Sequence, residues 1–221
     1  MCRIRSFFVS LFPSHFGNLN RRLLSAFQAW YNDFRKGCDE MNQTAEKLKL
    51  SMERMGVSGA AILPVDRIPF DRELRKSCES NRCGIFGKNW ACPPLVGEID
   101  ELIARAKTYH TAVVFQDVYK ISDSFDIEGM QEAAEKHRKL ARAVNDCEEK
   151  PEDALMLGAG GCDFCERCAA QEDKPCRFPD KAFASLEAYG VYVSALAEAC
   201  GMKYINGVNT ITYFGAVLLK D

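Results

Sequence analysis

The chain has 221 residues, of which 47% are hydrophobic and 27% charged, and this composition excludes a disordered or collagen-like chain. Lys and Arg number 29 against 31 Asp and Glu, a balance that gives no overall positive field, so we expect no nucleic-acid partner. The length predicts one domain with an appendage or two small domains, and the outlying feature is the count of 11 cysteines.

Residues 1–40 are predicted to be an N-terminal extension, either a non-native start or an amphipathic helix. Apolar side chains recur at helical spacing at Leu19, Leu23, Phe27, Trp30 and Phe34. Basic side chains oppose them at Arg21, Arg22, Arg35 and Lys36. A basic amphipathic helix can lie on an anionic membrane surface, so a membrane partner is expected only if this extension acts as an anchor. We favour the interpretation in which the extension is dispensable.

Residues 41–221 are predicted to form a single cysteine-rich metal-binding domain. Apolar residues recur at helical spacing over residues 42–55, 99–106 and 127–147. Short apolar runs predict strands over residues 60–63, 111–119, 154–157 and 211–219. Strands separated by helices predict an α+β, or mixed α/β, fold, with a small central sheet flanked by helices and two cysteine-rich metal-binding loops.

The start of the chain does not predict secretion. The apolar run that follows the basic residues of segment 1–5 ends at Pro13, and no small-residue cleavage site lies nearby. No stretch supplies the roughly 20 apolar residues of a membrane-spanning helix. We therefore expect a cytoplasmic protein, whose clustered thiols stay reduced and bind metal in preference to forming disulfides.

The strongest motif is Cys162-x2-Cys165-x2-Cys168-x7-Cys176. Three thiols at a spacing of three residues let one tight loop wrap a compact object, with backbone amides free to hydrogen-bond sulfide. Structural zinc is more often held by two separated cysteine pairs. The spacing therefore favours a 4Fe-4S cluster, with zinc as the alternative cofactor and disulfides or free thiols as a weaker one.

A second cysteine group has the pattern Cys78-x4-Cys83-x8-Cys92-Pro-Pro. Its spacing is looser, and a fourth ligand is missing locally. A Cys followed by Pro is typical of the last ligand in bacterial ferredoxin motifs, and Phe86 and Trp90 could shield a cluster from water. The alternative is a set of buried structural thiols beside a small aromatic core.

Three sequence motifs, which follow one another along the chain, resemble those of a known family. They are Cys-x4-Cys-Gly-x-Phe-Gly-Lys-Asn-Trp-x-Cys-Pro-Pro from Cys78, Gly-Gly-Cys-x2-Cys-x2-Cys-x7-Cys-Arg-x-Pro through Cys176, and Ser-Leu-Glu-Ala-Tyr-Gly-Val from Ser185. The chain from residue 52 to residue 219 resembles the predicted metal-binding protein family, domain of unknown function 2284, and departs from it in the N-terminal extension. The resemblance implies metal binding through Cys78, Cys83, Cys92, Cys162, Cys165, Cys168 and Cys176. It implies no activity.

Seven motif cysteines are one fewer than two fully ligated cubane clusters require. An iron held by three thiolates would be open to water or substrate, whereas an eighth ligand would favour electron transfer. Candidates for that ligand are His137, Cys147 and Cys200, for each of which packing in the core is the competing interpretation. A single cluster that takes ligands from both groups is a third possible arrangement.

The function expected from these motifs is that of an iron-sulfur protein acting in electron transfer or as a redox accessory to a partner enzyme. No acid, base or nucleophile set accompanies the cysteines; Glu187, which follows a predicted helix start at Pro179-Asp180, is expected on a solvated face. The alternatives are an enzyme that uses an open-iron cluster to activate a small substrate, and a zinc-stabilised interaction module.

Basic residues flank both cysteine groups, at Arg75, Lys76, Arg82 and Lys88 and at Arg167, Lys174, Arg177 and Lys181. Cations of this kind could stabilise electrons added to a negatively charged cluster and could dock an acidic redox partner protein. The competing interpretation is an ordinary solvated rim. The oligomeric state is not predicted.

Overall fold

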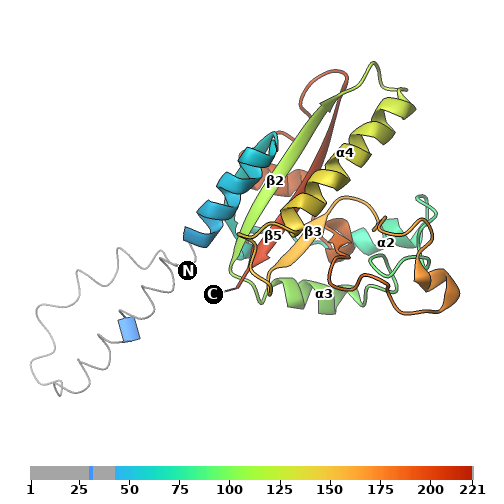
Figure 1. The fold of residues 1–221 in the computed structure, drawn as a ribbon, viewed down its shortest axis with the longest axis horizontal. Helices are drawn as coiled ribbons and strands as arrows, with labels where there is room; N and C mark the ends of the chain where they lie inside the picture. The colour runs from blue at the N-terminus through green and yellow to red at the C-terminus, as the bar shows by residue number, and fades with distance from the viewer. Residues whose placement is uncertain (1–29, 32–42, 221) are drawn as a thin grey trace, which may run out of the picture. The chain divides into compact units, whose positions relative to one another are not determined.

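The computed structural model describes residues 30–31 and 43–220 (Figure 1). The chain divides into two units, Met1–Gln43 with Asp221 and Thr44–Lys220, and the second unit holds the elements described below. Of the helix expected across residues 19–34, residues 30–31 are helical and the remainder lies outside the described residues. The prediction that residues 1–40 form an extension falls largely outside them as well.

A five-stranded mixed sheet forms the centre of the second unit, in the order β1-β2-β5-β3-β4. The strands are β1 (Gly59–Pro64), β2 (Thr111–Lys120), β3 (Leu155–Gly158), β4 (Ala184–Ser185) and β5 (Thr210–Leu219). β2 pairs antiparallel with β1 and β5, and β3 pairs antiparallel with β5 and parallel with the short β4. This arrangement confirms the predicted α+β fold.

Both faces of the sheet are buried, which explains why its strands are continuous apolar runs. On β2, Ala112 and Val114 join one hydrophobic cluster, while Val113 and Phe115 join a second cluster on the opposite face. Opposite Phe115 in the β2–β5 register lies Gly215, where an added Cβ would stand 2.3 Å from a carbon of the Phe115 ring. Only glycine leaves room for this ring at the centre of the sheet.

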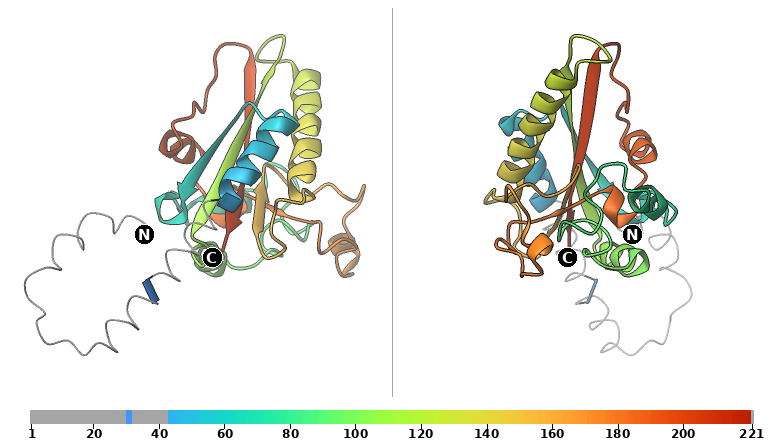
Figure 2. Two further views of the ribbon diagram at one scale, coloured as in Figure 1. Left: turned by 60° about the vertical axis from the view of Figure 1, so that its left-hand side comes forward. Right: turned by 90° about the vertical axis from the view of Figure 1, so that its right-hand side faces the viewer.

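Helices cover both faces of the sheet (Figure 2). The second cluster lies under α4 (Ile127–Asn145) and a helix over residues 43–55, which contribute Ala45, Leu48, Met52, Ala141 and Val144. The first cluster lies under α3 (Ile99–Ala106), α5 (Val193–Ala199) and the 3-10 turn η3 (Glu187–Tyr189). No helix in the described residues has the length and apolar composition that a bilayer crossing needs.

The helices predicted over residues 42–55, 99–106 and 127–147 are confirmed at 43–55, Ile99–Ala106 and Ile127–Asn145, whereas the prediction fails in the segment between Cys176 and η3. There the helix expected from Pro179-Asp180 is wrong: residues 179–181 form a turn that leads into β4. The chain stays extended because Ala184 pairs with Leu157 in the sheet. A further helix, α2 (Leu74–Glu79), was not predicted, because only six residues form it and none of them is buried.

Candidate metal centre

The first cysteine group begins on a helix and continues through turns, which corrects the expectation of a simple loop. Cys78 lies in the last turn of α2, and Cys83 and Cys92 lie in the turns that follow. Residues with positive φ permit these turns, namely Asn81, Gly84, Gly87 and Gly97. The Asn81 side chain also accepts a hydrogen bond from the backbone N–H of Phe86 at 3.1 Å.

The second group occupies the irregular segment between β3 and β4. Cys162, Cys165 and Cys168 precede the 3-10 turn η2 (Ala169–Glu172), and Cys176 follows it. The chain reverses after η2 at Asp173, whose φ is 50°. The four cysteines of this group are among the residues that line one small cavity of about 20 Å³, together with Trp90, Phe164 and Phe178 of its apolar wall. The structure thus brings the four cysteines of the strongest motif around a common space.

The two cysteine groups, about seventy residues apart in sequence, are in direct contact. The Asn89 amide donates a hydrogen bond to the Cys162 carbonyl at 2.6 Å, and the Trp90 indole N–H donates to the Lys174 carbonyl at 2.9 Å. A Cβ built on Gly161 would lie 3.3 Å from the Cys92 sulfur. Residues of the first motif therefore hold the backbone of the second.

The pKa values of the thiols also indicate that the two cysteine groups lie close together. Burial, with smaller contributions from the charges of Cys83, Cys78, Cys162 and Cys168, raises the pKa of Cys92 to about 11. Burial also raises the pKa of Cys162, with smaller contributions in the same direction from other thiolates and Asp163. These thiols are protonated at neutral pH in the metal-free protein, so metal binding has to displace their protons.

Two arginines oppose the negative charge that the thiolates would carry. Burial raises the pKa of Cys78, and the Arg75 guanidinium counteracts this rise. Arg75 is itself held by a hydrogen bond of 3.0 Å to the Gly97 carbonyl. A hydrogen bond to Cys165 raises the pKa of the Arg177 guanidinium, which also donates to the Arg167 carbonyl at 2.8 Å. Each cysteine group thus has a cation positioned to stabilise bound thiolates.

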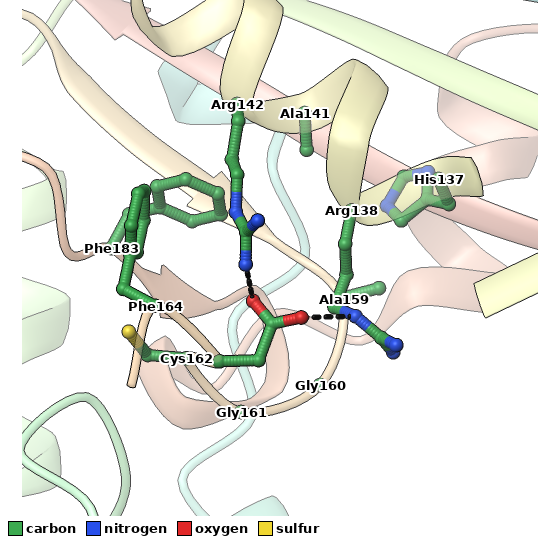
Figure 3. Close-up of a pocket in the computed structure, with 11 residues that line it drawn as sticks. His137, Arg138, Ala141, Arg142, Ala159, Gly160, Gly161, Cys162, Phe164 and Phe183 are labelled. Atoms are coloured by element: carbon green, nitrogen blue, oxygen red, sulfur yellow. Dashed lines mark hydrogen bonds and ion pairs between the residues drawn. The ribbon is translucent and has the colours of Figure 1, made fainter. Parts of the chain in front are cut away.

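A second cavity, next to Cys162, is bounded by α4 (Figure 3). Arg138 and Arg142 reach from α4 toward the segment that carries Cys162, where both form ion pairs with Asp163. The Arg138 Nε lies 2.5 Å from an Asp163 carboxylate oxygen, and the Arg142 guanidinium lies over the Phe164 ring at 4.4 Å. Asp163 therefore anchors the second cysteine group to α4.

His137, also on α4, faces the core. Its Nδ1 lies 2.6 Å from the Asp117 carboxylate, and its ring stacks on Tyr213 with centroids 5.1 Å apart. The other two candidates for an eighth ligand are packed too. Cys147 contacts the second hydrophobic cluster and Cys200 the first, where burial raises the pKa of Cys200 to about 11. His137 lines a cavity together with Cys162.

Within the described residues, no group of three or more His, Cys, Asp or Glu side chains is arranged to hold a single metal ion. The structure brings the seven predicted cysteines into one region without gathering them at one point. Sequence reasoning missed the residues that position this region, Asn89, Asp163, Arg138 and Arg142. For Asn89 and Asp163 a signal existed, since each lies inside one of the cysteine motifs.

The fold and the cysteine-rich region define the class as an α+β protein with a candidate metal-binding centre. Comparison with protein families matches residues 61–219 to the family described as predicted metal-binding protein (DUF2284). The chain belongs to this family, as its three motifs indicated. Comparison with curated proteins and with solved structures found no significant match.

Proposed function

We propose that this protein binds iron-sulfur clusters and serves in electron transfer or as a redox accessory to a partner enzyme. The observation that carries the proposal is the cavity lined by Cys162, Cys165, Cys168 and Cys176. Thiolates are the ligands of 4Fe-4S clusters, and a bound cluster would supply one-electron storage. The apolar wall of the cavity would limit access of water to the cluster, which is one determinant of reduction potential.

The chain's own groups suit the binding of a negatively charged cofactor. The Arg177 side chain forms a hydrogen bond with Cys165, and the charge of Arg75 lowers the pKa of Cys78 and so favours its thiolate. Both would stabilise added negative charge without taking part in any bond to iron. The Cys92 thiol, close to Cys162 and Cys168, places a first-group ligand within range of the second group. One cluster in each group, or a single cluster shared by both, is compatible with this proximity.

An acidic redox protein is the partner that this proposal includes. Exposed cations surround the second cysteine group at Arg167, Lys174, Arg177 and Lys181. Lys174 already pairs with Glu172 at 2.9 Å, so part of this charge is compensated within the chain. Arg177 lies 3.8 Å from the same Glu172 carboxylate, so Arg167 and Lys181 are the cations that would steer an acidic partner toward the cluster. A reducing compartment such as the cytoplasm would keep the seven thiols available to metal.

The competing function is an enzyme that activates a small substrate on an open iron. It is favoured by a groove of about 660 Å³ that reaches Cys176 and the buried Tyr189, since this volume suits a small ligand. A zinc-stabilised interaction module remains the third candidate, because thiolates also bind zinc.

Metal analysis of anaerobically purified protein tests the proposal. We expect a brown protein with about four to eight irons per chain and an equal amount of acid-labile sulfide, because each cubane holds four of each. Cys165→Ser should remove about four irons and lower the melting temperature, since metal binding contributes to folding in such segments. The matched control is Cys147→Ser, a thiol outside both motifs, which should keep its iron.

Stoichiometric zinc with no sulfide would overturn the iron-sulfur proposal and favour the interaction module. Unchanged iron in Cys165→Ser would overturn the assignment of the second cysteine group.

A further inference from the structure

A pair of ionisable side chains lies inside the core, and the proposed function makes no use of it. Asp117 on β2 is 2% exposed and His137 on α4 is 1% exposed. The His137 Nδ1 lies 2.6 Å from an Asp117 carboxylate oxygen. Burial of such groups costs free energy unless their polar atoms find hydrogen-bond partners, so the remaining atoms of the pair decide what it can do.

The His137 ring is held in one orientation. It stacks on the Tyr213 ring of β5, with centroids 5.1 Å apart and an interplanar angle of 21°. Tyr213 lies opposite Asp117 in the β2–β5 register, and its hydroxyl donates a hydrogen bond of 3.3 Å to the Met130 carbonyl. The register of the sheet therefore places both the carboxylate and the stacking ring against His137.

The carboxylate also determines which ring nitrogen carries a proton. An ionised carboxylate only accepts hydrogen bonds, so the His137 Nδ1 that faces Asp117 is the protonated nitrogen. In the neutral imidazole the other nitrogen, Nε2, is then the acceptor. A carboxylate that fixes the tautomer in this way is the arrangement that orients a histidine base.

The His137 Nε2 atom has no partner within the part of the chain that the structure describes, although it is buried. A buried polar atom of this kind needs an explanation, and a bound water molecule is a common one. Figure 3 shows a ring nitrogen of His137 pointing toward Arg138 and Ala159, which line the same cavity.

This cavity lies between α4 and the segment that carries Cys162. Its volume is about 10 Å³, which matches the room that one water molecule needs and is too small for a larger ligand. Ala159, Gly160 and Gly161 form part of its wall, and their peptide groups can hydrogen-bond to water. Figure 3 shows the Cys162 sulfur well separated from the His137 ring, so the imidazole does not touch this predicted ligand.

We propose that the cavity binds one water molecule through the His137 Nε2, and that Asp117 positions the imidazole for this contact. The water connects the buried pair to the backbone of residues 159–161 and places an acid–base group next to the second cysteine group. The assignment needs no metal and does not rest on the proposed function. It bears on the enzyme candidate, because a general base can act through one water and the cysteine motifs supply no base.

Crystal structures and 15N NMR spectra of three full-length proteins test the assignment. They are the wild type, Asp117→Asn, which removes the carboxylate charge at nearly constant shape, and Tyr213→Phe. The last is the matched control, since it keeps the stacked ring and removes only the hydroxyl. The readouts are an ordered water at His137 and the identity of the ring nitrogen that carries the proton.

In the wild-type protein we expect a water within about 3 Å of the His137 Nε2 and of a backbone atom of residues 159–161, with the ring proton on Nδ1. Asp117→Asn should lose the preference for the Nδ1 proton, because an amide donates as well as accepts, and should lose the ordered water. Tyr213→Phe should keep both.

A dry cavity in the wild-type crystal, at a resolution that shows other buried waters, would overturn the assignment, and so would a direct bond from Nε2 to a protein group. These two readouts need no variant to fold. The positioning role of Asp117 is wrong if the wild-type proton sits on Nε2 alone, if Asp117→Asn keeps the proton on Nδ1 and the water, or if Tyr213→Phe loses them equally. A protein that holds this water but neither iron nor sulfide contradicts the proposed function and leaves the water site intact.

Discussion

At the scale of single residues, Cys92 links the two halves of the candidate centre. It is half-buried, its sulfur faces Gly161, and its charge interacts with thiols of both groups. The cost of burying a thiolate here is large, as its raised pKa shows. Bound metal would compensate that cost, because the metal replaces the proton on each ligand.

A pH dependence of the metal-free protein follows from this thiol. The pKa of Cys92 rises from 9.0 to about 11, so between these values the folded protein binds more protons than the unfolded chain. The contribution of Cys92 to stability is therefore complete below pH 9 and is lost as the pH rises toward about 11. Urea unfolding of reduced, metal-free protein should give a free energy of unfolding that falls over this range.

The matched comparison is Cys92→Ser, which should fall less steeply with pH than wild type. Cys200, whose pKa is also raised to about 11, contributes a similar slope that the Cys92 variant retains. Identical slopes for wild type and Cys92→Ser would contradict the burial of the Cys92 thiol.

At the scale of elements, α4 determines where the second cysteine group lies. Its buried stripe includes His137, Ala141 and Val144, which anchor the helix on the sheet. Arg138 and Arg142, one turn apart beside that stripe, both reach Asp163 between Cys162 and Cys165. Because α4 is packed on the sheet, its two arginines hold the irregular segment of the second cysteine group in a fixed position.

Replacing Asp163 with Asn tests this role of α4. The change removes two partly exposed ion pairs, which together contribute about 0.4–2 kcal/mol. For a domain of this size we expect the melting temperature to fall by about 1–8 °C and a chelator to remove iron faster from the second cluster. Asp180→Asn is the matched control, an exposed carboxylate of the turn at residues 179–181.

Iron release at the wild-type rate from Asp163→Asn, with an unchanged melting temperature, would show that α4 does not hold this segment. A loss of the same size in Asp180→Asn would show that the effect is not specific to Asp163.

The elements also show how far the sequence could predict this molecule. The helices over residues 43–55, 99–106 and 127–145 were predictable because each buries one stripe, and β2 and β5 because both faces of the sheet are covered. The turn at residues 179–181 was not, since the pairing of Ala184 with Leu157 is a long-range contact that local preference does not encode.

The same distinction applies to the candidate centre. Cysteine spacing named the seven thiols, because ligands of one cluster lie close together in sequence. It could not place Asn89 on the Cys162 carbonyl, since this contact depends on how the chain returns across the sheet.

At the scale of the whole molecule, the helix over residues 43–55 closes one side of the core. Leu48 and Met52 are completely buried there, against a cluster that includes Val113 and Phe115. Burial of two such side chains contributes about 3–6 kcal/mol, which is a large share of the roughly 5–15 kcal/mol that stabilises a domain. The fold therefore requires this helix, whatever the role of the preceding residues.

Two shortened proteins test where the required part begins. A chain that starts at Met41 should stay soluble and keep the iron content and melting temperature of the full chain, because it retains Leu48 and Met52. A chain that starts at Val57 should aggregate or melt at a much lower temperature, because the surface formed by Val113 and Phe115 would be exposed to water. Loss of iron or solubility in the Met41 protein would show that residues 1–40 belong to the fold. If that protein keeps its metal but fails to bind anionic vesicles that the full chain binds, residues 1–40 act as a membrane anchor, because their basic and apolar residues would be the part that contacts the lipid.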